Sequence, residues 1–264
     1  MADKKFFDKS RLIADDDLAR LAEKVPWQDL FEILTHILVL ASAAGREHAK
    51  SVDALVSFAG MGEELRELFV IWLYGEDDTR AKRLWLTGQG RHEDFRNPTL
   101  EELRGEPYNV PSHKMGGVLI KDWEDHTNGQ AVWVAERVEE FGMRSFSVTT
   151  SPYHMLRTYL GCLGAFLRNG KSVEEVPLMV PLPAPIAPNR EVPYGGYSGW
   201  QAIGGEVERI FAYQNLGRIA TLSDLQDYLN LHPELWEYDP RIAAAAKLDR
   251  GFGLLREEQQ NAEG

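Results

Sequence analysis

The segment from Val148 to Arg157 gathers side chains that can bind a ligand or move a proton. Its polar members are Thr149, Thr150, Ser151, Tyr153, His154 and Arg157. His154 and Arg157 are three residues apart, so they share one face of a helix. Because the ordinary pKa of an imidazole is about 6.5, His154 is the candidate general acid or base of this segment. The hydroxyl groups and the guanidinium suit an anionic or polar ligand.

The same segment has the pattern of a strand, a turn and a helix start. Ser151 is a favourable N-cap, and Pro152 suits the first helical position, where a missing N–H costs nothing. The free N–H groups of that first turn then face the edge of the sheet. We expect Arg157 to point toward residues 87–88 or the hydroxyls of residues 149–152, and Arg157→Ala to weaken ligand binding while moving the melting temperature little. A capped helix with a partly buried phenol and imidazole explains the same residues without a ligand.

Another Gly-containing turn follows an earlier strand-like stretch. Gly60 and Gly62 permit a close approach of the backbone to a ligand, and Glu63 and Glu64 occupy the first turn of the next helix. These carboxylates oppose phosphate at a helix N-terminus and favour a ribose, an amine or a sulfonium. A plain tight turn is the alternative.

The next strand-like stretch ends in a turn that suits an anion. It consists of Thr87, Gly88, Gln89 and Gly90, followed by Arg91 and His92. The glycines can expose backbone N–H groups, and the two basic residues supply positive charge. The turn has no Gly-Lys-Ser/Thr sequence, so it is not the phosphate loop of a P-loop NTPase. An ordinary loop is again the alternative.

A polar turn before the helix predicted over residues 128–141 completes the candidate ligand site with Asp125, Thr127 and Asn128. Thr127 and Gln130 have the spacing of a capping box, and Asp125 can also cap this helix. Asn128 lies in the first turn, from which it can reach the sheet edge. The residues that could bind a metal if the fold brought them together are His92, Glu124, Asp125, His126 and His154. Their spacing is not that of a known metal motif, and we predict no metal.

Alternating strand-like and helix-like stretches predict an α/β fold. Strands are expected near residues 52–59, 83–87, 118–121, 144–150 and 176–182, and helices over residues 63–74, 128–141 and 152–168. This order indicates a Rossmann-like open parallel sheet of about five strands with helices on both faces. In such sheets ligands bind beyond the carboxyl ends of the strands, where the strand order reverses.

The chain divides into three predicted parts. Residues 1–50 form an N-terminal helical segment, residues 51–182 the Rossmann-like core, and residues 183–264 a C-terminal loop and helical region. In this last part the Pro-, Gly- and Tyr-rich stretch 181–205 is expected to be a long loop. Helices are expected over residues 206–216 and 222–231.

Composition excludes several classes of partner. The 264-residue chain has a formal net charge of −12, which argues against nucleic acid and against an anionic membrane. Its single cysteine, Cys162, excludes an internal disulfide and lies in an apolar stretch, where we expect it to be buried and inert. No apolar leader follows Met1, so we expect a cytoplasmic protein with a small-molecule ligand. The oligomeric state is left open.

Several of these motifs resemble the YdcF/SanA/ElyC-like proteins, a bacterial family. The match covers about half the chain, from Val52 to Leu182, and its most specific part is Val-Thr-Thr-Ser-x-Tyr-His-Met-x-Arg at residues 148–157. Thr87-Gly88 and Thr127-Asn128 match two further elements. The chain departs from the family pattern at Gly129-Gln130, where Glu-Asn is expected.

This resemblance implies a Rossmann-like core and a nucleotide-like ligand. The SanA and ElyC branches carry a membrane anchor, so this chain looks more like the soluble YdcF branch, which is reported to bind S-adenosylmethionine. The resemblance supplies no reaction, and whether the protein is an enzyme is left open.

Three functions follow from these observations. The first is an enzyme or binder of an adenosine-containing molecule, with S-adenosylmethionine foremost, which the pair Glu63-Glu64 favours. The second is a hydrolase or transferase acting on phosphate or pyrophosphate esters, with Arg91, His92 and Arg157 holding the anion. The third is a non-catalytic sensor or partner-binding protein. The sequence identifies no pair of nucleophile and base, which keeps the third function open.

Overall fold

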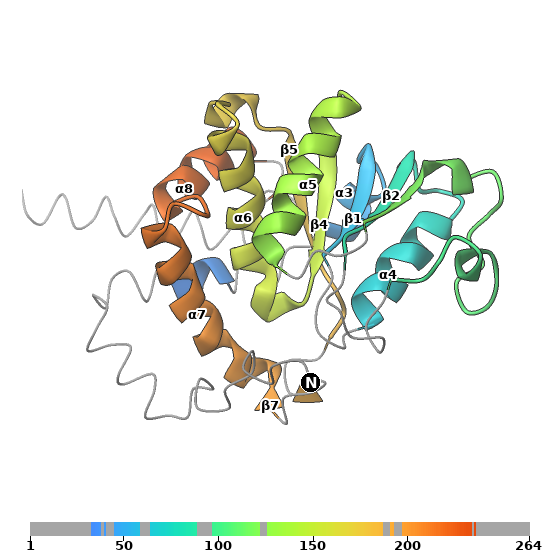
Figure 1. Ribbon diagram of the computed structural model, residues 1–264, viewed down its shortest axis with the longest axis horizontal. Helices are drawn as coiled ribbons and strands as arrows, with labels where there is room; N and C mark the ends of the chain where they lie inside the picture. Colours follow the sequence, from blue (N-terminus) through green and yellow to red (C-terminus); the bar gives the residue numbers. More distant parts are fainter. Residues whose placement is uncertain are drawn as a thin grey trace, which may run out of the picture.

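A five-stranded, all-parallel sheet forms the centre of the protein (Figure 1). The computed structural model describes residues 33–37, 40, 45–58, 64–88, 97–121, 126–186, 191–192, 197–233 and 235. The strands are β1 (Ala54–Ser57), β2 (Arg83–Leu86), β3 (Val118–Ile120), β4 (Ser145–Thr150) and β5 (Leu178–Pro183). Their order is β3-β2-β1-β4-β5, so the predicted Rossmann-like α/β fold is confirmed.

Helices cover both faces of the sheet, as the strand–helix alternation predicted. The helix α4 (Glu64–Gly75) connects β1 to β2 on one face. On the other face α5 (Thr127–Glu140) and α6 (Met155–Arg168) pack side by side (Figure 1). The short helix α3 (Gly45–Ala49) packs against β5, and its contact is so close that a Cβ atom on Gly45 would lie 1.9 Å from the carbonyl oxygen of Pro181. The N-terminal part was predicted to be helical, and its described residues 33–37, 40 and 45–49 are helical.

Large apolar side chains fill the space between the sheet and α5–α6. Trp85 of β2 meets Trp133 of α5 edge to face at 6.0 Å between ring centroids, and Phe146 of β4 meets Phe166 of α6 at 6.1 Å. Every residue of β1 is buried, as expected of a central parallel strand that is covered on both faces. This core holds the carboxyl ends of the strands in fixed positions.

Short 3₁₀ turns connect several of these elements. They are η4 (Glu102–Arg104), η5 (Met115–Gly117), η6 (Pro152–His154) and η7 (Val173–Glu175). The turn η6 is the one that matters for the site, because it connects the end of β4 directly to α6.

The C-terminal helices lie over the α6 side of the core. They are α7 (Gly199–Asn215) and α8 (Leu222–Leu231), and a two-stranded antiparallel pair, β6 (Glu191–Val192) and β7 (Tyr197–Ser198), precedes α7. The phenol of Tyr228 in α8 donates to the carbonyl of Pro177 at 2.9 Å and accepts the backbone N–H of Met179 at 2.7 Å. These two hydrogen bonds connect α8 to the beginning of β5.

The prediction of a continuous loop over residues 181–205 was wrong, because this range contains the end of β5, the strands β6 and β7, and the start of α7. Helix α7 begins at Gly199 rather than at residue 206, because Ser198 and Gln201 form a capping box. The Ser198 backbone N–H donates to Gln201 Oε1 at 2.8 Å, and the Ser198 hydroxyl accepts the Gln201 N–H at 3.4 Å. Helix α8 begins and ends at the predicted residues.

The strand order reverses between β1 and β4. From β1 the chain proceeds outward through β2 and β3, and it then crosses back to β4 on the other side of β1. The carboxyl ends of these two neighbours are where a parallel sheet of this kind binds ligands. No helix in the described part of the chain has the length and apolar character needed to cross a membrane.

Candidate functional site

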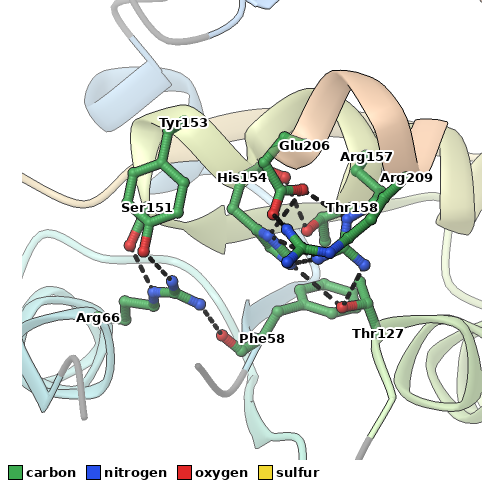
Figure 2. A network of polar contacts seen from close by, with 10 residues as sticks. All are labelled: Phe58, Arg66, Thr127, Ser151, Tyr153, His154, Arg157, Thr158, Glu206 and Arg209. Carbon is green, nitrogen blue, oxygen red and sulfur yellow. Dashed lines mark hydrogen bonds and ion pairs between the residues drawn. The ribbon is translucent and has the colours of Figure 1, made fainter. Parts of the chain in front are cut away.

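Arg66 connects the two loops that flank the reversal point (Figure 2). It lies in α4, and its Nε donates to the Ser151 hydroxyl, beyond the end of β4, at 2.6 Å. Its two terminal nitrogens donate at 3.4 Å, one to the carbonyl of Phe58 just after β1 and the other to the Tyr153 hydroxyl. Arg66 is only 3% exposed, so this guanidinium is buried at the carboxyl edge of the sheet.

Arg66 was not among the residues predicted for the site. The sequence did contain a signal. A basic side chain near the N-terminal end of a helix is disfavoured by the helix dipole, so its presence there indicates a specific partner. For Arg66 that partner is the Ser151 hydroxyl. Ser151 has the extended backbone of an N-cap residue, as predicted, but its hydroxyl makes no capping bond and accepts from Arg66 instead.

Arg157 forms a buried ion pair that the sequence did not predict. Its Nε lies 2.5 Å from Oε2 of Glu206 on α7, and its NH1 donates to the Thr127 hydroxyl on α5 at 3.2 Å. Within the described part of the chain it makes no hydrogen bond to residues 87–88 or 149–152, so the expected orientation was wrong. A guanidinium that is 8% exposed needs a carboxylate partner, and the fold brings one from a helix 49 residues away in the chain.

Glu206 is surrounded by cationic and imidazole groups. Besides Arg157, its carboxylate contacts Arg209 NH1 at 2.8 Å and His154 Nδ1 at 3.2 Å. Burial by itself raises the pKa of Glu206, but the nearby Arg157, His154 and Arg209 outweigh burial and hold that pKa well below its ordinary value. Glu206 is therefore ionised at neutral pH.

His154 is neutral at physiological pH. Burial, followed by the charge of Arg157, lowers its pKa to about 4, although the Glu206 carboxylate acts in the opposite direction. The expectation of an imidazole that titrates near neutrality was therefore wrong. A neutral imidazole can accept a proton, so His154 is available as a base and not as an acid.

The predicted capping box of α5 does not form. The N-cap is His126, and Thr127 is already the first helical residue, one position too late for its hydroxyl to cap the helix. The Thr127 hydroxyl instead lies 3.1 Å from His154 Nε2 (Figure 2). Gln130 turns to the end of β2, where its Nε2 donates to the carbonyl of Gly88 at 3.0 Å and its Oε1 accepts the Thr87 hydroxyl at 2.9 Å.

The structure brings most of the other described candidates to the same edge. Thr149 and Thr150 are fully buried at the end of β4, and the Thr150 hydroxyl has no hydrogen-bond partner among the described residues. Asn97, which the sequence analysis did not single out, joins the ends of β2 and β3 by donating to the carbonyls of Thr87 at 2.8 Å and of Lys121 at 3.4 Å. Asn128 is not part of the cluster, because its side chain accepts from Arg168 at 3.0 Å on the surface.

Several predicted site residues lie outside the described residues. These are Gly60, Gly62, Glu63, Gln89, Gly90, Arg91 and Asp125. Within the described part of the chain, no group of three or more His, Cys, Asp or Glu side chains is arranged to hold a metal ion. Cys162 is buried, as predicted, and burial raises the pKa of its thiol, so the thiolate needed for nucleophilic chemistry does not form at neutral pH.

Comparisons with protein-family models, with curated proteins and with solved structures found no match to this chain.

Proposed function

We propose that this protein binds a nucleotide-like small molecule at the reversal point between β1 and β4, through an anionic group of that molecule. The observation that carries the proposal is the buried guanidinium of Arg66, which joins the β1–α4 and β4–α6 loops at the edge where open parallel sheets bind their ligands. The proposal includes membership of the YdcF-type branch, on the motif at residues 148–157, and a cytoplasmic location.

The charge balance of the cluster supports an anionic ligand group. Among the described residues, two guanidinium groups (Arg157 and Arg209) contact the Glu206 carboxylate, and a third, that of Arg66, is buried at the same sheet edge, although the chain as a whole has a net charge of −12. Guanidinium groups gathered at one sheet edge of an acidic protein can bind the carboxylate or phosphate group of a ligand. The buried hydroxyl of Thr150 lacks a partner among the described residues and so provides a further hydrogen-bonding group at the same edge.

Two ligand classes fit this site. S-adenosylmethionine is the first, because of the resemblance and because Glu63 and Glu64 oppose a triphosphate at the neighbouring turn; its amino-acid carboxylate would supply the anionic group. The second is a phosphate or pyrophosphate ester. The buried guanidinium of Arg66 favours this second class, since guanidinium binds phosphate oxygens in a bidentate manner.

Calorimetric titration with S-adenosylmethionine, ATP and inorganic pyrophosphate tests the proposal and ranks the two classes. If S-adenosylmethionine is the ligand, it binds more tightly than ATP. If a phosphate ester is the ligand, pyrophosphate and ATP bind and S-adenosylmethionine does not.

Arg66→Lys keeps the charge but loses the planar set of donors, and we expect it to weaken binding about tenfold or more. Arg104→Lys, at an exposed position, is the matched control and leaves binding unchanged. Failure of all three compounds to bind would refute the proposal.

A further inference from the structure

Three side chains from three different elements form a row in which each lies within hydrogen-bonding distance of the next. The hydroxyl of Thr127, at the start of α5, lies 3.1 Å from Nε2 of His154 in η6. The other ring nitrogen, Nδ1, lies 3.2 Å from Oε2 of Glu206 in α7. A hydroxyl, an imidazole and a carboxylate in this order allow the ring to take the proton of the hydroxyl while the carboxylate orients the ring.

As a base toward Thr127, His154 needs its one ring proton on Nδ1, and the position of Arg157 is compatible with that tautomer. Its NH2 lies 2.9 Å from Nδ1 and 3.3 Å from Nε2. An atom in the plane of the imidazole cannot be that close to both nitrogens, because other atoms of the ring stand in the way, so this NH2 lies over the face of the ring. Glu206 can only accept a proton, so a proton on Nδ1 serves the 3.2 Å contact with Glu206 and leaves the Nε2 lone pair for the Thr127 hydroxyl. This is the tautomer that a base needs.

The surroundings of Thr127 favour negative charge on its oxygen. Thr127 is the first residue of α5, and its hydroxyl makes no capping bond, so the positive end of the helix dipole acts on this oxygen. Arg157 NH1 donates to the same oxygen at 3.2 Å. Thr127 is half-buried, whereas His154 is 7% exposed, so of these two residues Thr127 is the more exposed.

We propose that Thr127 is the nucleophile of a phosphoryl-transfer reaction, with His154 as its base and Glu206 as the residue that positions His154. The proposal rests on the phosphate-ester class of the proposed function. Thr127 Oγ attacks the phosphorus atom, the new O–P bond forms and the bond to the leaving oxygen on the opposite side breaks. The hydroxyl proton moves to Nε2, and the leaving group departs as its anion. Water then attacks the phosphothreonine from the opposite side and loses a proton to solvent, the bond between phosphorus and Thr127 Oγ breaks, the proton held on Nε2 returns to Oγ, and inorganic phosphate leaves.

The experiment uses the full chain and p-nitrophenyl phosphate. With the wild-type protein we expect a burst of p-nitrophenolate equal to the amount of protein, and a mass increase of one phosphoryl group on Thr127 after an acid quench. Thr127→Ser keeps both, because it keeps the hydroxyl, and Thr127→Val, which has nearly the same shape, loses both. His154→Gln lowers the burst rate about 10²- to 10⁴-fold, the usual contribution of a general base.

Glu206 is tested separately, because it acts through His154. Glu206→Gln lowers kcat and leaves KM nearly unchanged, whereas Glu208→Gln makes the same chemical change at an exposed position of α7 and alters neither. If Glu206→Gln does not fold, the Thr127 variants still decide the question.

The outcomes separate this inference from the function on which it rests. Turnover without a burst or an adduct, or a Thr127→Val variant as fast as the wild type, overturns the role of Thr127. Absence of any turnover overturns it as well, and if pyrophosphate still binds in calorimetry, the proposed binding function stands. Absence of both turnover and pyrophosphate binding overturns the phosphate-ester class itself.

Discussion

At the scale of single residues, Arg157 is a structural ion-pair partner as well as a member of the candidate site. Removing it leaves the Glu206 carboxylate buried with one strong partner fewer, so Arg157→Ala is expected to lower the free energy of unfolding by about 3 kcal/mol, against the small effect that the sequence suggested. Urea unfolding measures this. Adding Glu206→Ala to Arg157→Ala removes the unpaired charge and is expected to restore part of the stability. If Arg157→Ala alone unfolds at the wild-type midpoint, the pair does not contribute to stability.

At the scale of elements, α7 is the helix that completes the cluster, because it carries both Glu206 and Arg209. Its start depends on the capping box of Ser198 and Gln201, so Ser198→Ala is expected to cost about 1 kcal/mol and to loosen the first turn of α7. The loss is measured by thermal unfolding and by hydrogen exchange at the start of α7. Ser172→Ala, in the analogous capping box of the short turn η7, provides a comparison away from the site and leaves exchange in α7 unchanged.

At the scale of the whole molecule, stability is expected to depend on pH through the buried cluster. The pKa of His154 is about 4 in the folded protein and about 6.5 in the unfolded chain, so between these values the unfolded chain binds more protons. Stability therefore falls as the pH drops from about 6.5 to 4, by about 3 kcal/mol for this residue. Below the ordinary pKa of a glutamate the loss continues, because the folded-state pKa of Glu206 is held low and its protonation removes a favourable interaction.

Urea unfolding between pH 7 and pH 4.5 checks this dependence, with His154→Gln as the control. Glutamine does not titrate, so the slope of the unfolding free energy against pH should be smaller in this variant above pH 4.5. A wild-type unfolding free energy that stays constant over the same range would contradict the assignment of His154 as a buried neutral base.

The elements of the sheet could be predicted because their signals are local. A short stretch of chain is enough to favour a strand in the apolar runs of β1 and β2. The same holds for the helical pattern of α8, from Thr221 to Leu231. The alternation of such stretches restricts the fold to an open parallel sheet, because right-handed crossovers leave few other arrangements. The start of α7 was also a local signal, Ser-x-x-Gln at residues 198–201, and it was overlooked among the prolines and glycines before it.

The partners of the site residues depended on the tertiary structure. The sequence by itself determined that Ser151, His154 and Arg157 stand at one strand end and are chemically capable of binding or proton transfer. It did not determine that Arg66 donates to the Ser151 hydroxyl, 85 positions away in the chain. Nor did it determine that Glu206 pairs with Arg157 and contacts His154, which lie 49 and 52 positions away. Whether a buried cation meets a hydroxyl or a carboxylate is decided by which helices pack over the sheet edge, and that packing is a property of the whole core rather than of any one segment.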